Sequence, residues 1–431
     1  MEIALLIIVF VGLFALGVPI AICIGLSTLA TMVVTMDFLP AATTIAQRMA
    51  GGLNSFALLA IPLFILSGQL MAQGGIARRL IEFSKALIGM VPGGLAFVNV
   101  ISCTLFGAIS GSSIAATTAV GSFMIPEMKK EGYDKNFAAA VTVTSATTGL
   151  LIPPSNTLIV YAVASGGVSI AALFVAGYVP GLMISIATLI VCAIYARRNN
   201  MPAGESVSLR LALKYTIAAL PSLFLIVLVI GGILAGIFTA TEAGAIAVLY
   251  ALLLSSVVYR EIGLADIASI CLKAAQTTAV VMFLIAASIA MSWILAYQNI
   301  PAMVAEGLVG ISDNPLVILL LINIVLLLVG IFMDMTPAVL IFTPIFLPVA
   351  IELGMSPLHF GIMMVLNLCI GLCTPPVGTI LFVGCALAKT TINRMVRPMM
   401  PMYAAMFVVL MLITYIPELS EGLPRFFGLI D

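Results

Sequence analysis

The sequence predicts an all-α integral membrane protein made of two related halves, each with a re-entrant hairpin and a broken helix. Composition, charge distribution and an internal repeat each point to this fold. Of the 431 residues, 63% are hydrophobic and only 8% are charged, and the mean hydropathy is +1.29. A protein that faces water over its whole surface carries many more polar residues than this. Lipid is therefore the solvent for most of the chain.

The charged residues leave long gaps between them. None lies between residues 86 and 126 or between 136 and 196, and Asp334 is the only one between 314 and 351. Each gap exceeds the roughly 20 residues that cross a bilayer. The apolar stretch from residue 3 to 36 is too long for the core of a signal peptide, so we expect it to stay in the membrane, with a break near Gly17 and Pro19.

The second half of the chain repeats the first at one constant spacing, here called the repeat spacing. It pairs Pro126 with Pro348, Gly132 with Gly354, Gly149 with Gly371, Pro153-Pro154 with Pro375-Pro376, and Thr157 with Thr379. A double proline in register with flanking glycines is improbable by chance, even in a chain with 36 Gly and 22 Pro. We therefore interpret residues 1–205 and 206–431 as two copies of one unit.

The basic residues suggest that the two copies are inverted. The connection between the halves carries four basic residues, Arg197, Arg198, Arg210 and Lys214, and one acidic residue, Glu205. Both ends of the chain are acidic, with Glu2 at one end and Glu418, Glu421 and Asp431 at the other. The positive-inside rule places such a connection in the cytoplasm and both termini outside. Inverted repeats are typical of secondary transporters, with the binding site at midplane between the copies.

Four interruptions of the helices are expected to form that site. The first hairpin covers about 90–126 and has its tip at 110–113. The second covers about 315–350 with its tip at 333–337, where Asp334 falls opposite Ser112 and Pro337 is expected to break the helix. The broken helices cover about 138–165 and 359–388, and each contains a double proline, which removes two backbone donors. Unwound backbone at membrane depth has to line a cavity or be buried in protein.

These interruptions suit both a cation and an anion. Free carbonyl and hydroxyl oxygens can bind a hard cation such as sodium, and the starts of half-helices attract an anion. No Lys or Arg lies in the four segments, so an anionic substrate would depend on helix dipoles, hydroxyl groups and nearby sodium. A carboxylate at the centre of a membrane helix costs about 2.5 to 3.5 kcal/mol and usually has a function, which singles out Asp334.

Other classes of function are disfavoured. The seven cysteines are scattered without zinc or redox spacing, and His359 is the only histidine, so an imidazole metal cluster is excluded. No nucleotide fingerprint is present, and we expect no enzymatic activity. With a net charge of zero and no basic run longer than Arg197-Arg198, we expect no binding of nucleic acid.

Five motifs together resemble the large membrane subunit (M subunit, DctM-like) of tripartite ATP-independent periplasmic (TRAP) transporters. They are SGSS at 110–113, IPPSN at 152–156, GIFTATEAG at 236–244, MDMTP at 333–337 and CTPPVGT at 373–379. The resemblance covers essentially the whole chain; the usual TPTEA is here TATEA. It implies an elevator-type secondary transporter of the bacterial inner membrane that imports organic acids such as sialic acid or C4-dicarboxylates, with sialic acid slightly preferred. It also implies two partners, a small four-helix membrane subunit and a periplasmic substrate-binding protein.

The resemblance also implies which residues bind the ligands. We expect two or more coupling sodium ions, one at the first tip with the 149–157 break and another at the second tip with the 371–379 break. The candidate substrate-binding residues are Ser112, Ser113, Ser155, Asn156, Asp334 and Thr336. The candidate sodium ligands are Ser110, Ser112, Gly149, Ser155, Asn156, Gly330, Asp334, Gly371, Thr374, Gly378 and Thr379.

Two other functions remain open at this stage. One is a channel or a structural subunit, because small residues in membrane helices often only mediate packing. The other is a self-sufficient sodium symporter for divalent anions, built on the same hairpin-and-broken-helix plan. Saturable, sodium-dependent counterflow would separate a transporter from a channel, and dependence on a soluble binding protein would separate the two kinds of transporter.

Overall fold

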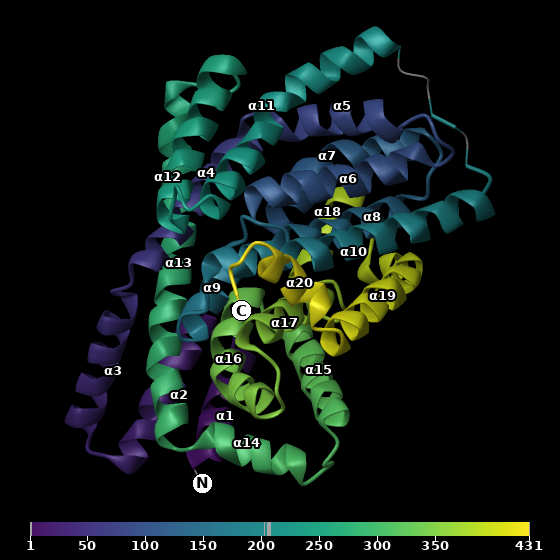
Figure 1. The fold of residues 1–431 in the computed structure, drawn as a ribbon. Helices are drawn as coiled ribbons and strands as arrows, with labels where there is room; N and C mark the ends of the chain where they lie inside the picture. The colour runs from purple at the N-terminus through teal and green to yellow at the C-terminus, as the bar shows by residue number, and fades with distance from the viewer. Residues whose placement is uncertain (1, 202, 205–207, 431) are drawn as a thin grey trace.

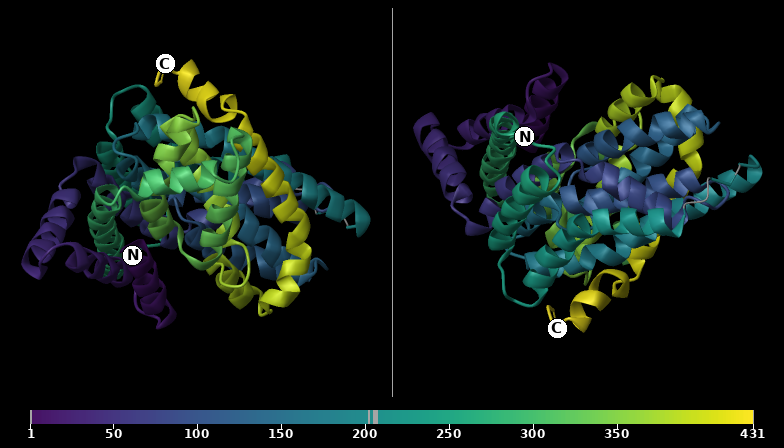
Figure 2. Two further views of the ribbon diagram at one scale, coloured as in Figure 1. Left: turned by 90° about the horizontal axis from the view of Figure 1, so that it is seen from below. Right: turned by 90° about the horizontal axis from the view of Figure 1, so that it is seen from above.

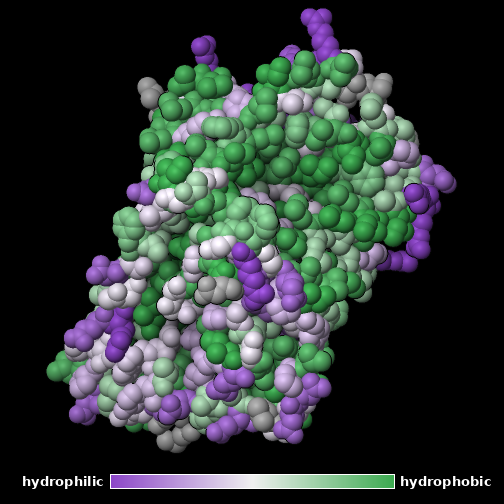
Figure 3. All heavy atoms as spheres, viewed as in Figure 1, coloured by the Kyte–Doolittle hydropathy of each residue, from purple (hydrophilic) through white to green (hydrophobic). Residues whose placement is uncertain are grey.

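The structure is a computed structural model that describes residues 2–201, 203–204 and 208–430. Its described part is helical, with one isolated bridge between Pro92 and Ala203, and eight of its helices are long and apolar enough to cross a membrane. Hydrophobic side chains cover most of the face shown in Figure 3, while hydrophilic ones gather at its lower end and along its edges. The expected all-α membrane fold is confirmed. Glu205, Asp431 and the expected boundary at 205–206 lie outside the described residues.

One set of helices forms a column at the left of Figure 1. Gly17, with a φ of +77°, separates the first two helices, so the apolar N-terminal stretch is broken where Gly17 and Pro19 predicted. In both views of Figure 2 the first three helices lie at the left, beside the long helix α13. The column consists of α1 (Glu2–Ala15), α2 (Ile20–Thr35), α3 (Phe38–Leu53), η1 (Phe56–Leu59), α4 (Ala60–Gln73), α12 (Ala240–Leu253), η3 (Leu254–Val258) and α13 (Leu264–Tyr297). Helix α11 (Leu209–Leu234) runs across the top of Figure 1 and packs against α5 (Ile76–Ile88) and α12.

The remaining helices form the two hairpins, the two broken helices and the elements around them. The hairpins are α6 (Gly94–Ser110) with α7 (Ser113–Lys130), and α15 (Pro315–Phe332) with α16 (Met335–Glu352). The broken helices are α8 (Lys135–Ala146) with η2 (Thr147–Leu150) and α9 (Asn156–Ala164), and α17 (Pro357–Leu372) with α18 (Thr379–Ala388). Three more helices pack around them: α10 (Ile170–Arg198), α19 (Ile392–Tyr415) and α20 (Glu418–Phe426).

The repeat spacing is visible in the helix boundaries. Helix α7 begins at Ser113 and ends at Lys130, and α16 begins and ends one repeat spacing later, at Met335 and Glu352. The peptide bonds Pro153-Pro154 and Pro375-Pro376 are both cis. Two residues separated by the repeat spacing even touch, because the Cys369 thiol lies 3.6 Å from the Thr147 carbonyl oxygen. The broken helices of the two halves therefore pack directly against each other.

Two short helices link the column to the hairpins. Helix α5 (Ile76–Ile88) follows α4 and leads into the first hairpin, and α14 (Ile300–Val309) follows α13 and leads into the second. In Figure 1, α5 lies near the top and α14 at the bottom, towards opposite ends of α13. The corresponding connections of the two halves thus lie at opposite ends of the molecule.

Glycine pairs hold each hairpin close to a broken helix. A methyl group added to Gly107 would lie 2.6 Å from the Cα of Gly149, and one added to Gly371 would lie 2.6 Å from the Cα of Gly330. Only glycine permits backbones to approach so closely. Three of the four glycines were predicted as sodium ligands, and the structure gives all of them a packing role; Gly107 was not singled out by the sequence.

Two other motif residues act at the ends of helices. Glu242 closes a capping box at the start of α12, where its carboxylate accepts bonds from the N–H and hydroxyl of Thr239, both at 2.8 Å. Pro337 was expected to break the helix at the second tip, but it lies in the first turn of α16. Proline is tolerated there because that N–H has no partner within the helix. The break itself falls on the extended residues Met333 and Asp334.

Candidate functional site

Both hairpin tips and the first break meet at one cavity of about 220 Å³, here called the central cavity. Among the described residues, Asp334 is the only charged one that lines it. The cavity also borders two helices of the column, α4 and α13, so it lies where the column meets the hairpins. Its lining comprises Ile61, Ile65, Gly68, Gln69, Ser110, Gly111, Ser112, Ser113, Ile114, Ala115, Leu150, Asn156, Thr157, Val160, Thr277, Val281, Asp334, Met335, Thr336 and Leu372.

Helix termini of both polarities surround this cavity. The first residues of three helices line it, namely Ser113 of α7, Asn156 of α9 and Met335 of α16. The last residues of three others also line it, namely Ser110 of α6, Leu150 of η2 and Leu372 of α17. Helix starts offer N–H groups and the positive end of the helix dipole, and helix ends offer carbonyl oxygens. The site can therefore attract an anion and a cation together without a basic side chain.

The first tip lies against the first break. Gly111 has a φ of +60°, and a methyl group added to it would lie 2.6 Å from the Pro154 carbonyl oxygen. Ser112 caps α7 by accepting a bond from the N–H of Ala115 at 3.3 Å, and the Ser110 hydroxyl donates to the Ser112 carbonyl at 3.4 Å. The hydroxyl groups of the tip are thus held at the edge of the cavity.

The second tip meets the second break in a similar way. The N–H of Gly378 donates to the Ile331 carbonyl at 3.2 Å, and Gly378 has a φ of +37°. A methyl group added to Gly378 would lie 2.9 Å from the carbonyl oxygens of both Leu372 and Thr374. A side chain at this position would come too close to these two backbone oxygens, so the close approach requires glycine.

Each break also holds a side-chain oxygen that lacks a partner. Among the described residues, eight buried side-chain nitrogen or oxygen atoms have no hydrogen bond, and two of these are Asn156 Oδ1 and Thr379 Oγ1. These two atoms lie at the starts of α9 and α18, beside the two double prolines. A buried oxygen without a donor is costly, and a bound cation would satisfy it. The described residues contain no group of three or more His, Cys, Asp or Glu that could hold a metal, so oxygens of this kind are the available ligands.

The predicted site residues fall into two groups. Those that line the cavity are Ser110, Ser112, Ser113, Asn156, Asp334 and Thr336. Those that do not line it are Gly149, Ser155, Gly330, Gly371, Thr374, Gly378 and Thr379. Ser155 is fully buried, and its hydroxyl donates to the Leu150 carbonyl at 2.5 Å while capping α9. The Thr374 hydroxyl donates to the Ile370 carbonyl at 2.7 Å.

Comparison with known proteins identifies the family of this chain. A family model described as "Tripartite ATP-independent periplasmic transporter, DctM component" matches residues 7–419. The chain belongs to this DctM family. It is therefore the large permease component of a transporter for organic acids and not an enzyme, as the sequence motifs predicted.

Several relatives match this DctM-family permease over almost their whole length. The uncharacterized protein YgiK of Salmonella typhimurium is 51% identical, with 97% of this chain and 96% of YgiK covered. The C4-dicarboxylate TRAP transporter large permease protein DctM of Rhodobacter capsulatus is 39% identical, with 97% and 98% covered. The sialic acid TRAP transporter large permease protein SiaM of Vibrio cholerae is 37% identical, with 97% of each chain covered.

A solved transporter structure shares the fold of the permease. MtrF of Neisseria gonorrhoeae, described as one of a class of antimetabolite efflux pumps, superposes with a TM-score of 0.60 at 13% identity and covers 87% of this chain and 84% of its own. At this identity the likeness concerns the fold alone.

Sequence reasoning missed the contribution of the column to the permease site. Gln69 of α4 and Thr277 of α13 both line the cavity. Each helix is apolar overall but holds other polar residues as well, such as Gln73 in α4 and Lys273 in α13. The sequence therefore marks Gln69 and Thr277 as polar without singling them out. Gly68 packs against the first tip, since a methyl group added to it would lie 2.8 Å from the Ser110 carbonyl oxygen.

The central cavity of the permease adjoins a larger cavity of about 700 Å³, here called the vestibule. The two cavities share Gln69, Ser112, Ile114, Ala115 and Thr277. The vestibule reaches the ends of α4 and η3, where Gln73, Arg78 and Glu261 line it. The vestibule is therefore the neighbour of the central cavity at that end of the column.

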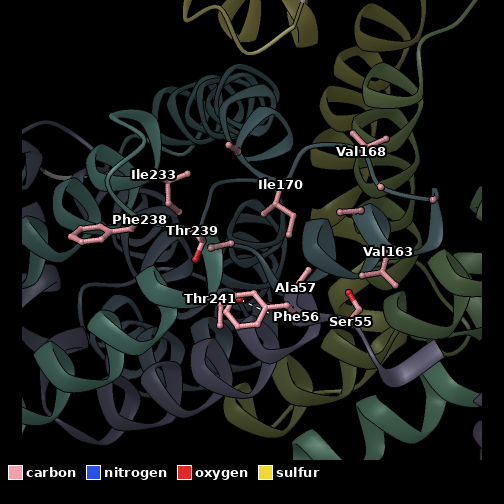
Figure 4. Close-up of a pocket in the computed structure, with 15 residues that line it drawn as sticks. Ser55, Phe56, Ala57, Val163, Val168, Ile170, Ile233, Phe238, Thr239 and Thr241 are labelled. Carbon is pink, nitrogen blue, oxygen red and sulfur yellow. Dashed lines mark hydrogen bonds between the residues drawn. The ribbon is translucent and has the colours of Figure 1, made fainter. Parts of the chain in front are cut away.

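Another pocket of about 560 Å³ lies at the opposite ends of α4 and α12, and Figure 4 shows it. Its walls come from the column at 55–57 and 238–241 and from the 166–171 region beside α10. Phe56 and Thr241 point towards each other in Figure 4, and the Thr241 hydroxyl donates to the Phe56 carbonyl at 3.1 Å. None of its described lining residues also lines the central cavity. Among the described residues, the central cavity thus shares part of its lining with the vestibule and none with this pocket.

Proposed function

We propose that this permease couples the import of a small dicarboxylate to two or more sodium ions, as part of a complex with a small membrane subunit and a periplasmic substrate-binding protein. The observation that carries the proposal is the convergence of three helix starts, three helix ends and one carboxylate on one cavity, with no Lys or Arg among its described lining residues. An anion there needs positive charge that the side chains do not supply. Bound sodium supplies that positive charge, so the binding of sodium and the binding of the anionic substrate depend on each other.

The duplication supports more than one sodium ion. The first tip and the first break contribute Ser110, Ser112 and Asn156 to the lining of the central cavity. The second tip contributes Asp334 to that lining, and the second break holds the unpartnered Thr379 Oγ1 at the start of α18. Oxygen ligands without a cluster of carboxylates suit sodium. We propose one sodium ion at each tip, with the substrate held between the tips by Ser113, Thr336 and the helix starts.

The size of the cavity favours a C4-dicarboxylate over a sialic acid. Pockets that enclose drug-sized ligands usually measure roughly 300 to 1,000 Å³, and the central cavity measures about 220 Å³. The relatives include permeases named for each of these substrates. A four-carbon diacid needs less room than the much bulkier sugar acid, so the cavity volume reverses the slight preference for sialic acid derived from the sequence.

We propose that the substrate crosses the membrane by an elevator motion within the bacterial inner membrane. The hairpins and broken helices supply most of the cavity, and the column supplies only parts of α4 and α13. A body that carries most of the site can move past a fixed column, with α5 and α14 as the connections. In this proposal the connection that begins with Arg197 and Arg198 faces the cytoplasm, the two halves are inverted, and the vestibule opens inwards.

The proposal is tested by uptake into proteoliposomes that contain the permease, its small subunit and its binding protein. A labelled C4-dicarboxylate and a labelled sialic acid are offered separately in sodium and in potassium buffers. We expect saturable uptake of the dicarboxylate in sodium only. Saturable uptake of the sialic acid alone would overturn the substrate assignment, and non-saturable flux would favour a channel. Full uptake without either partner would favour the self-sufficient symporter.

A further inference from the structure

A cluster of charged residues stands at the mouth of the vestibule. Arg78 Nη2 lies 2.7 Å from Glu261 Oε1, and Arg79 Nη2 lies 3.4 Å from the same oxygen. Two guanidinium groups therefore share one carboxylate, so the three side chains carry a formal sum of one positive charge. Among the described residues that line the vestibule, Arg78 is the only basic one and Glu261 the only acidic one.

The two arginines differ in how fully their groups are engaged. Arg79 donates to the Gly75 carbonyl at 2.9 Å, its guanidinium lies 3.5 Å from the centroid of the Tyr259 ring, and its side chain is only 14% exposed. The side chain of Arg78 is 53% exposed, and in the described part of the chain its guanidinium donates to Glu261 alone. The Arg79 side chain is thus held in place by its contacts, whereas Arg78 still has N–H donors that can bind a ligand in the vestibule.

Polar side chains connect this cluster to the central cavity. Ser112, Gln69 and Thr277 belong to both cavities, and Gln73, Thr118 and Ser122 continue towards Arg78. Amide and hydroxyl groups can hydrogen-bond a carboxylate without holding it as firmly as a full charge does. These polar residues lie between the central cavity, which has no basic residue among its described lining, and Arg78, the only basic residue among those described that line the vestibule.

We propose that Arg78 is a second, weak binding point for the carboxylate substrate, used as it passes between the central cavity and the α5 end of the column. This inference rests on the proposed transport of an organic anion. A guanidinium matches a carboxylate with two parallel hydrogen bonds. Glu261 competes for the same guanidinium, so the bound substrate is exchanged readily and is not trapped. The cluster therefore attracts the anion to the vestibule and still releases it.

The test is counterflow across oriented transporters. The binding protein is supplied on one face of proteoliposomes containing permease and small subunit, and the concentration of a C4-dicarboxylate such as succinate is varied on the other. Exposed charge pairs contribute about 0.2 to 1 kcal/mol, and about 1.4 kcal/mol is tenfold in affinity. Arg78→Gln should therefore raise the half-saturating concentration at the vestibule face by about 1.4-fold to fivefold. Glu261→Gln frees Arg78 and should lower it by a similar factor. Both effects should shrink in high salt.

The two substitutions are expected to change the half-saturating concentration in opposite directions, which separates substrate binding from a purely structural ion pair. If the pair only braces the protein, both substitutions remove the same bond and change transport in the same direction, which would overturn the inference. Lys130→Gln is the matched control, because Lys130 is exposed at the end of α7 and does not line the vestibule. If Lys130→Gln changed the half-saturating concentration as much as Arg78→Gln does, the inference would also be overturned. Failure of the proposed function would look different, as an absence of sodium-dependent uptake by the unmodified complex.

Discussion

Replacing Asp334 by Asn tests the sodium site directly. Asp334 is the N-cap of α16, in extended geometry with φ of −69° and ψ of 161°, and its side chain makes no capping bond to the helix. It is exposed within the central cavity and is the only charged residue among the described ones that line it. Asn caps helices about as well as Asp and has nearly the same volume. The substitution therefore removes a charge and little else.

The expected size of the effect follows from the distance at which a carboxylate binds a cation. A unit charge about 4 Å away contributes about 1 kcal/mol in water and about 4 kcal/mol at an effective dielectric constant of 20. A partly exposed carboxylate lies between these limits. Because about 1.4 kcal/mol is tenfold in affinity, we expect the sodium half-saturation to rise by about fivefold to several hundredfold. The favourable interaction of Asp334 with the helix dipole is smaller, about 0.3 to 1 kcal/mol.

The assay is sodium-dependent uptake of a labelled dicarboxylate at equal amounts of reconstituted protein. Ser112→Ala is the matched control, since Ser112 occupies the equivalent position in the first repeat and caps α7. Its loss should cost about 0.5 to 2 kcal/mol of stability and should change the sodium half-saturation less, because the backbone carbonyls of that tip remain. A normal sodium half-saturation and a normal rate for Asp334→Asn would refute the reasoning and give the residue a structural role only.

Other predictions follow from the same geometry. Replacing sodium by potassium should abolish uptake, and the sodium dependence should be steeper than that of a single site; full uptake in potassium driven by a proton gradient would remove sodium from the mechanism. Gly107→Ala places a methyl group 2.6 Å from the Gly149 Cα and should lower the melting temperature, at a cost of about 1 to 3 kcal/mol. Gly25→Ala, which meets nothing within 4 Å, should cost nothing, and equal losses would show that the close backbone contact is unimportant. Glu242→Ala should cost about 1 kcal/mol through the lost capping box while leaving the sodium half-saturation unchanged, and a changed half-saturation would give Glu242 a role in transport.

The sequence by itself determined the membrane environment, the two-fold repeat and the four interruptions. These features depend on local chemistry, because charge is excluded from lipid and a double proline cannot continue a helix. The constant repeat spacing then identified equivalent positions, so Asp334 and Ser112 could be matched without any structure. The motifs added the family, which the comparison confirmed.

Only the tertiary structure decided which predicted residues face the cavity. Ser155 and Asn156 are neighbours in sequence, yet one hydroxyl is buried in a capping bond and the other side chain lines the cavity. Gln69, Thr277 and Arg78 reach the site or its vestibule from helices that lie far from the motifs in sequence. Periodicity and composition report on the surroundings of a residue along its own helix. Which helix packs against a break depends on contacts between distant segments, such as Gly107 with Gly149, and no local pattern encodes those.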